Sequence, residues 1–369
     1  MASGEGRVAR VADVRLSRFE RLPWRRIILV ILGIGLITLV VVGSVATLSK
    51  PAGEGGYSGE TWAGFVVDGI SQGAIYALIA LGYTLVYGIL RMINFAHGEV
   101  MMTGAFGGFF FVTAYAESGF LNRHPITAML IVTLAAVIIS MSVAVLLERI
   151  AYRPLRNAPR LVPLITAIGA SLFLQNAFRG FFGPQARGFP RPDVLVGDVT
   201  IGGLEIPKVR ILVVVVGLIC MVFLQQFVAR TRTGRSMRAV AQDREIASLM
   251  GIDVNRVIMI TFAVGGILAG IAAVLFATTF EQVRFDMGFK VGIAAFTAAV
   301  LGGIGSIGGA VLGGFLLGLL QAIGPALILS GFGIPSPFAL KDAFTFLVLV
   351  LVLVYRPGGL LGTGEQEKV

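Results

Sequence analysis

The sequence predicts an all-α integral membrane protein, a polytopic helical bundle of about ten segments, some of them short or discontinuous. Apolar residues make up 56% of the 369 residues and charged residues only 14%, whereas soluble domains carry roughly 25% charged residues. The apolar residues form runs of about 20, the length that a helix needs to cross the hydrocarbon core of a bilayer. The alternation of apolar and polar residues that is typical of transmembrane β-strands is absent from the sequence.

Ten apolar segments follow one another along the chain. The first, Ile27–Leu48, runs for 22 residues without a charge. The others are Trp62–Leu90, Gly98–Tyr115, Ile126–Leu147, Leu161–Phe178, Ile211–Val228, Val257–Phe280, Val291–Leu301, Ala310–Leu329 and Asp342–Tyr355. Because Val291–Leu301 falls short of the ~20 residues needed to span a bilayer, we expect it to enter the membrane without crossing fully, or to pair with the next segment.

The first sixty residues differ in character from the rest. Residues 1–26 contain seven arginines and no long apolar stretch. A cleaved signal peptide is the alternative reading of Ile27–Leu48, but the apolar core of such peptides is roughly 7–15 residues long, and we expect a retained anchor. We therefore divide the chain into residues 1–61, an Arg-rich cytoplasmic arm plus an extra transmembrane anchor, and residues 62–369, the main bundle.

The distribution of basic residues predicts the topology. With the N-terminus in the cytoplasm, the cytoplasmic segments (1–26, 91–97, 148–160, 229–256, 303–309 and 356–369) hold 20 of the 30 Lys and Arg residues. Cytoplasmic loops of membrane proteins carry such an excess, so we expect both termini in the cytoplasm. Basic residues in the cytoplasmic segments also account for the net charge of +10, so no nucleic-acid partner is needed to explain it.

Five polar residues form a stripe on the segment Trp62–Leu90. They are Asp68, Gln72, Tyr76, Tyr83 and Tyr87, whose spacings of four and seven place them on one helical face. Polar groups are costly against lipid, so this face looks into the bundle or into a wet path. Hydrogen bonding between helices and a transport path are equally good interpretations.

A second polar group interrupts the apolar runs between residues 91 and 99. It consists of Arg91, Asn94, His97 and Glu99, which lie within nine residues. The segment is either a tight cytoplasmic turn with capping residues or a helix broken at membrane depth. One His and one Glu are too few ligands for a metal site.

The largest polar feature is the segment 229–256. It mixes six arginines with Asp243, Glu245 and Asp253, and its apolar residues, Leu249 and Met250 among them, fall at nearly helical spacing. Gly251 is placed to stop a helix and Asp253 to cap the next one. An amphipathic helix on anionic lipid is one interpretation. The acidic residues on the same face favour instead a docking helix for a cytoplasmic partner.

Other motifs exclude several functions. The glycines from Gly302 to Gly318 follow no strand and no ribose-binding acid lies near them, so they predict close helix packing rather than dinucleotide binding. No P-loop motif occurs, no nucleophile has a base beside it, and Cys220 is the single cysteine. We expect a protein that is not an enzyme, has no cofactor or metal of its own, and relies on a separate motor for active transport.

Nine short motifs in order closely resemble the branched-chain amino acid permeases, the LivH-type membrane subunits of bacterial ABC importers. They cover roughly residues 62–362, and their correct order is far more specific than any single match. The motifs are GISQGAIYAL (69–78), GYTLVYG (82–88), INFAHGE (93–99), YRPLR (152–156), GRSMRA (234–239), AQD (241–243), MGI (250–252), AAVLGG (298–303) and RPGGLLG (356–362).

The resemblance implies a set of partners and a location. A permease of this family pairs with a second, homologous permease, two cytoplasmic ATPases that bind ATP and Mg²⁺, and an extracytoplasmic solute-binding protein. The complex lies in the bacterial cytoplasmic membrane, in contact with its lipid. Residues 62–369 would form the permease core, and 229–256 its coupling loop with a coupling helix. The coupling residues would be Arg235, Arg238, Asp243, Glu245 and Gly251. The translocation path would be lined by Asp68, Gln72, Tyr76, Tyr83, Asn94, His97 and Glu99.

Two departures from the family pattern leave alternatives for the substrate. Family members commonly begin after the first sixty residues, and the usual Lys before Ala295-Phe296 is Ala294 here. Related permeases carry urea or short amides as well as amino acids. A self-sufficient ion-coupled transporter or channel is the alternative from another class, although such proteins usually place paired charges within the membrane.

Overall fold

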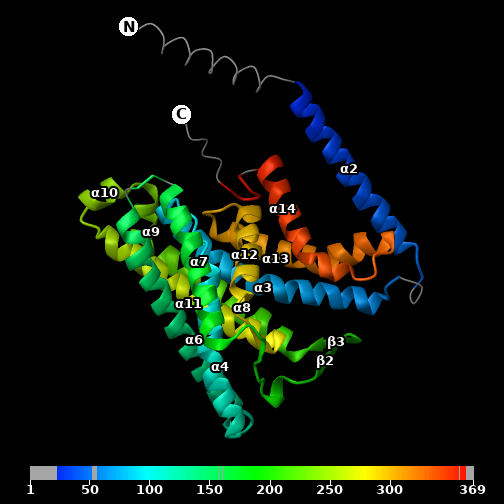
Figure 1. The fold of residues 1–369 in the computed structure, drawn as a ribbon, viewed down its shortest axis with the longest axis horizontal. Coiled ribbons are helices and arrows are strands. Elements are labelled where there is room, and N and C mark those ends of the chain that lie inside the picture. The colour runs from blue at the N-terminus through cyan, green and yellow to red at the C-terminus, as the bar shows by residue number, and fades with distance from the viewer. Residues whose placement is uncertain (1–22, 52–55, 157, 160, 357, 363–369) are drawn as a thin grey trace. The chain divides into compact units, whose positions relative to one another are not determined.

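Helices account for most of the chain. The computed structural model describes residues 23–51, 56–156, 158–159, 161–356 and 358–362, with side chains from Ile27 onward; most of the predicted Arg-rich arm lies outside these residues. The helices are α2 (Pro23–Leu48), α3 (Gly59–Leu90), α4 (His97–Glu117), α5 (Phe120–Arg123), α6 (Pro125–Leu147), α7 (Leu161–Phe182), α8 (Lys208–Arg230), α9 (Arg232–Gln242), α10 (Arg244–Leu249), α11 (Val254–Phe280), α12 (Met287–Gly302), α13 (Ile307–Gly324) and α14 (Lys341–Tyr355). Figure 1 shows their arrangement.

The strands are short and pair in two antiparallel sheets. Strand β1 (Arg187–Gly188) pairs with β4 (Gln282–Val283), and β2 (Asp198–Ile201) forms a hairpin with β3 (Leu204–Pro207). All ten predicted segments are helical, and among the described residues eight helical stretches are long and apolar enough to span a membrane. The predicted class, a polytopic all-α membrane protein, is confirmed.

The described chain divides into two units. Unit 1 comprises α2 with the residues up to Tyr57, together with residues 326–337; unit 2 comprises residues 58–325 and 338–362. Within unit 1, Gly43 of α2 lies against the Ile328 carbonyl. The Lys50 ammonium donates to the Ser330 carbonyl at 3.1 Å, and the Tyr57 hydroxyl bonds the Ser330 hydroxyl at 2.9 Å. Polar contacts near one end of α2 thus join the two chain segments of unit 1.

The core of unit 2 is built on α3, which packs against α13 through glycines. A Cβ on Gly314 would lie 2.6 Å from the Cα of Ala77, and a Cβ on Gly318 would lie 2.5 Å from the Cα of Gly73. Both distances are to backbone atoms, so only glycine permits this approach. The close packing predicted for the Gly302–Gly318 segment is confirmed.

Helix α12 is a short helix in the interior of unit 2. It begins at Met287, four residues before the predicted segment, and has 16 residues, or about 24 Å of helix against the ~30 Å of a hydrocarbon core. Most of its residues are buried. Its last two carbonyls, of Leu301 and Gly302, accept hydrogen bonds from the amides of Leu360 and Leu361 at 2.9 and 2.8 Å. The residues that follow α14 in the chain therefore satisfy the last two carbonyls of α12.

Unit 2 has two polar ends. Helix α8 starts directly after the β2–β3 hairpin and ends directly before α9, so the two features lie at opposite ends (Figure 1). We call the end with residues 198–207 the hairpin end and the end with residues 231–253 the loop end. Helix α3 begins beside β3, and its last turn contacts α10 at the loop end.

Candidate functional site

The middle of the predicted stripe on α3 lies inside unit 2. Tyr76 and Tyr83 are both buried. The Tyr76 hydroxyl donates to Oε1 of Gln321 on α13 at 2.7 Å, and the Tyr83 ring packs edge-on against His97, with the ring centroids 5.1 Å apart. These tyrosines tie α3 to α13 and α4, which is the interhelical role that the sequence left open.

The outer part of the stripe is accessible at the hairpin end. Asp68 is 43% exposed and pairs with Arg210 of α8 at 2.5 Å. Asp68 and Gln72 line a cavity of about 320 Å³ whose walls come from α3, α8, α11, α13 and residues 338–341. Arg210 was missed in the sequence because it borders an apolar run more than 140 residues away along the chain.

The residues of the second polar group lie around the first turn of α4. Asn94 is buried, and its Oδ1 accepts hydrogen bonds from the Ala96 amide at 3.1 Å and the Tyr152 hydroxyl at 2.7 Å. Asn94 thus has a turn role and also joins α4 to the π-helical turn Glu148–Tyr152. His97 and Glu99 belong to α4 itself and are buried.

Glu99 connects α4 to α7 in the interior. Its Oε1 accepts hydrogen bonds from the Ser171 hydroxyl at 3.1 Å and the Gln175 amide at 2.8 Å. A Cβ on Gly288 would lie 2.7 Å from the carbonyl oxygen of Gly98, so α12 packs directly over the start of α4. Gln175 stands out in the sequence as an amide within an apolar run, but its pairing with Glu99, 76 residues away, does not follow from the sequence.

Three polar atoms in this group have no hydrogen-bond partner among the described residues. They are Nδ2 of Asn94, Nε2 of His97 and Oε2 of Glu99. Space for the His97 ring is provided by Gly82 of α3, where a Cβ would overlap the imidazole, and by Gly265 of α11. Buried polar groups are usually paired, so three unpaired atoms within six residues make this group an exception in the described interior.

The hydroxyl of Tyr152 provides a direct test of this packing. We expect Tyr152→Phe to lower the free energy of unfolding by about 0.6–1 kcal/mol, the typical contribution of one hydrogen bond between membrane helices. The measurement is the unfolding midpoint in mixed micelles. Tyr87→Phe is the matched control. Tyr87 lies in the last turn of α3, and no hydrogen bond of its hydroxyl is found in the described part of the chain. Equal midpoints for the two variants would contradict the assignment.

Segment 229–256 folds into two short helices, α9 and α10, and the start of α11, with a break at Asp243 that the sequence pattern did not predict. Asp243 caps α10, with its Oδ1 accepting hydrogen bonds from the amides of Glu245 at 2.8 Å and Ile246 at 2.9 Å. Gly251 has a φ of 81°, and Asp253 caps α11 through the Arg256 amide at 3.1 Å. The helix stop and the cap expected at Gly251 and Asp253 are confirmed.

The outward face of α10 is apolar. Leu249 and Met250, which the sequence placed at nearly helical spacing, are 86% and 77% exposed, and Ile246 is 59% exposed. Helix α10 has only six residues, and its inward side is occupied by Ala247. We call Ile246, Leu249 and Met250 the α10 patch. Exposed Arg235 and Glu245 lie on the same loop.

Two arginines connect this loop to the ends of long helices. The Arg238 guanidinium donates to the carbonyl of Val228 at the end of α8. The Arg244 guanidinium donates twice to the carbonyl of Ile89 at the end of α3, at 2.7 and 3.2 Å. Both arginines therefore satisfy carbonyls that a helix end leaves open, and they join the loop directly to α3 and α8.

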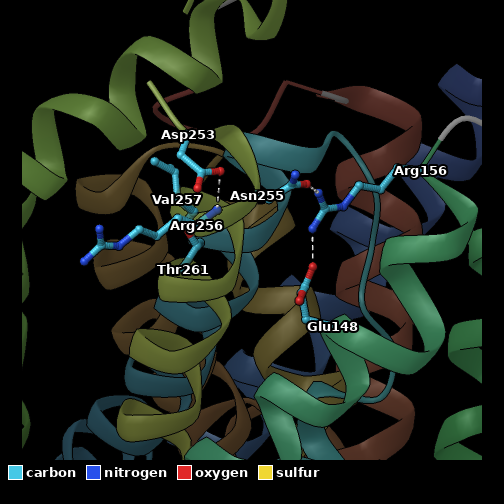
Figure 2. Close-up of polar contacts among 7 residues, drawn as sticks. All are labelled: Glu148, Arg156, Asp253, Asn255, Arg256, Val257 and Thr261. Atoms are coloured by element: carbon cyan, nitrogen blue, oxygen red, sulfur yellow. Dashed lines mark hydrogen bonds and ion pairs between the residues drawn. The ribbon is translucent and has the colours of Figure 1, made fainter. Parts of the chain in front are cut away.

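A further polar chain fixes the loop end beside these contacts. Figure 2 shows Arg156 between Glu148 and Asn255, with hydrogen bonds to both carboxylate and amide oxygens. Glu148 is buried, and Asn255 belongs to the first turn of α11. Burial and the charges of Arg156 and Arg91 lower the pKa of Arg244. The guanidinium groups at the loop end thus lie close enough to repel one another.

The fold and these polar features define a membrane transport subunit without an ATP-binding motif of its own. The chain belongs to the family described as the branched-chain amino acid transport system permease component, whose model matches residues 65–353. It is 44% identical over 307 residues to the high-affinity branched-chain amino acid transport system permease protein BraD of Pseudomonas aeruginosa, covering 82% of this chain and 97% of BraD. It is 40% identical to LivH of Escherichia coli K12, covering 82% and 96%. The resemblance drawn from the motifs is confirmed, and the chain is a transport component rather than an enzyme.

Proposed function

We propose that this chain is one of two permeases in a binding-protein-dependent ABC importer for branched-chain or related amino acids. Its partners are a second, homologous permease, two cytoplasmic ATPases that use ATP and Mg²⁺, and an extracytoplasmic solute-binding protein. The α10 patch carries the proposal. A largely exposed apolar surface on a charged loop outside the spans is typical of an interaction site, and this one is connected to the core helices through Arg238 and Arg244.

The proposed orientation places the loop end in the cytoplasm. The segment 229–256 contains six arginines, and Lys and Arg are enriched in cytoplasmic loops. The hairpin end then faces the solute-binding protein, and both termini lie in the cytoplasm. In this orientation the α10 patch faces the compartment that supplies ATP.

Coupling follows from the contacts of the loop. The α10 patch enters a groove of the ATPase, and Arg235 and Glu245 form the charged rim around it. Asp243 and Gly251 keep the shape of α10. When the ATPases close, α10 moves, and the Arg244–Ile89 and Arg238–Val228 contacts carry that movement to α3 and α8.

The translocation path begins at the hairpin end. Asp68 and Gln72 are accessible there and receive the substrate from the binding protein. Tyr76 and Tyr83 lie deeper and hold the path wall together. The unpaired atoms of Asn94, His97 and Glu99 form the part of the wall that changes partners when the bundle switches between its inward- and outward-open forms.

The proposed function is tested by purification from native membranes in mild detergent, followed by mass spectrometry and reconstitution. We expect two P-loop ATPases and a second polytopic subunit in fixed ratio. Proteoliposomes containing this complex and its binding protein should take up radiolabelled leucine only with ATP. Urea and short amides at the same concentration should not compete. A chain that emerges alone and takes up leucine in response to an ion gradient would overturn the proposal in favour of a secondary transporter.

A further inference from the structure

The cavity at the hairpin end combines charges of both signs with an aromatic wall. Its volume is about 320 Å³, at the lower end of the ~300–1,000 Å³ typical of small-molecule sites. A site of this size suits a single amino acid rather than a peptide. We call it the hairpin-end cavity.

Three charged side chains line the hairpin-end cavity. Asp68 and Arg210 form an ion pair and remain 43% and 25% exposed, so a ligand can reach both. Lys341, at the start of α14, also lines the cavity, and no ion pair of its ammonium occurs within the described ranges. One positive charge is therefore left without a carboxylate, which favours a ligand that carries one.

The charge pattern selects between classes of ligand. A simple anion would meet the Asp68 carboxylate, and a simple cation would meet both Arg210 and Lys341. A zwitterion can engage all three: its ammonium binds Asp68, and its carboxylate binds Lys341 together with the Arg210 guanidinium that the ammonium displaces. Free amino acids have this arrangement of charges.

A buried hydroxyl in the same wall is an independent sign of a ligand. Ser71 is only 1% exposed, it lines the cavity, and its hydroxyl oxygen has no hydrogen-bond partner among the described residues. An unpaired buried polar group costs roughly 1–3 kcal/mol. Gln72 presents its amide in the next position of the same wall. A bound ligand with donors and acceptors would satisfy the Ser71 hydroxyl and could also contact the Gln72 amide.

The remaining wall is suited to an apolar side chain. Phe65, Ile75, Phe280 and Phe338 line it, and the rings of Phe65 and Phe338 pack with their centroids 5.3 Å apart. Such a wall favours leucine, isoleucine or valine over polar amino acids.

We propose that the hairpin-end cavity is a low-affinity site for a free zwitterionic amino acid with an apolar side chain. This inference rests on the proposed function and places the first contact of the released substrate at Lys341 and Asp68. The Asp68–Arg210 pair opens when the ligand ammonium takes its place beside Asp68. Because that pair must be broken and the lining is partly exposed, we expect a Kd on the order of 1 mM.

The test is equilibrium binding of radiolabelled leucine to the full chain in lipid nanodiscs, without the binding protein. Lys341→Gln and Asp68→Asn should each weaken binding at least tenfold. The Kd of Lys341→Arg for leucine should stay within threefold of the wild type. That result would show that the weaker binding of Lys341→Gln comes from the lost charge and not from misfolding. Lys290→Gln is the matched control, since Lys290 is 56% exposed, pairs with Asp286 and does not line the cavity. Leucinamide and N-acetylleucine, which each lack one charge, should not compete.

The outcomes separate this inference from the proposed function. Leucine binding that is absent from the wild type, or unchanged in both Lys341→Gln and Asp68→Asn, overturns the inference even if the whole complex transports leucine with ATP. Binding that depends on both residues supports the inference. If such binding is found but the complete complex shows no ATP-dependent uptake, the importer assignment fails and the site itself stands.

Discussion

Replacing Leu249 by Glu is expected to reduce ATP-driven uptake at least tenfold while leaving the amount of folded chain in the membrane unchanged. Leu249 is 86% exposed, and surface substitutions usually change stability by no more than ~0.5 kcal/mol. In the proposed complex the same side chain is buried in a groove of the ATPase. A carboxylate there would lose its hydration without a partner, which costs several kcal/mol. The measurement compares uptake with the yield of chain from the same membranes.

The matched control introduces the same charge at the other end of unit 2. Ile201 of β2 is 54% exposed, and Ile201→Glu should retain the ATPases during purification, whereas Leu249→Glu should lose them. Normal uptake and normal retention of the ATPases in Leu249→Glu would remove the α10 patch from the coupling mechanism.

The second large effect is expected at the crossing of α3 and α13. Gly318→Leu should leave little or no monodisperse protein, because even its Cβ would lie 2.5 Å from the Cα of Gly73 and backbone atoms cannot move aside as a side chain does. Overpacking typically costs 1–3 kcal/mol and occasionally more; a clash with backbone between two core helices belongs to the upper end. The measurement is size-exclusion chromatography of detergent-extracted protein with a fluorescent reporter.

The control for this change lies on the same helix. Gly308 also belongs to α13, but a Cβ there meets nothing within 4 Å. Gly308→Leu places the same side chain and the same helix propensity in α13, and should give protein close to wild type in yield and peak shape. A similar yield from both variants would mean that the α3–α13 contact is not essential to the bundle.

Much of the fold follows from local features of the sequence. Uninterrupted apolar runs such as Ile27–Leu48 predicted the long helices, because length and composition alone decide whether a helix can cross a bilayer. Gly251 and Asp253 predicted the break before α11, since a helix stop and a cap depend on one or two residues. The start of α12 at Met287 was not predicted, because Gly288 and the charged Lys290 interrupt the apolar pattern before Val291.

The candidate site was predictable only in part. The stripe on α3 was visible from its spacing, but its partners Gln321 and Arg210 lie far away in sequence and are apposed only by tertiary packing. The α10 patch was missed for a different reason. Helical spacing indicates which residues share a face, yet in a six-residue helix it does not indicate which face is covered by the rest of the protein.

The hydrogen bonds that complete α12 have a consequence for biosynthesis. The carbonyls of Leu301 and Gly302 accept from the amides of Leu360 and Leu361, which leave the ribosome only after α13 and α14 have been made. Until then these two carbonyls at the end of α12 lack the partners that they have in the finished fold, and unpaired buried carbonyls are costly. The newly inserted chain therefore stays incomplete until the last stage of translation.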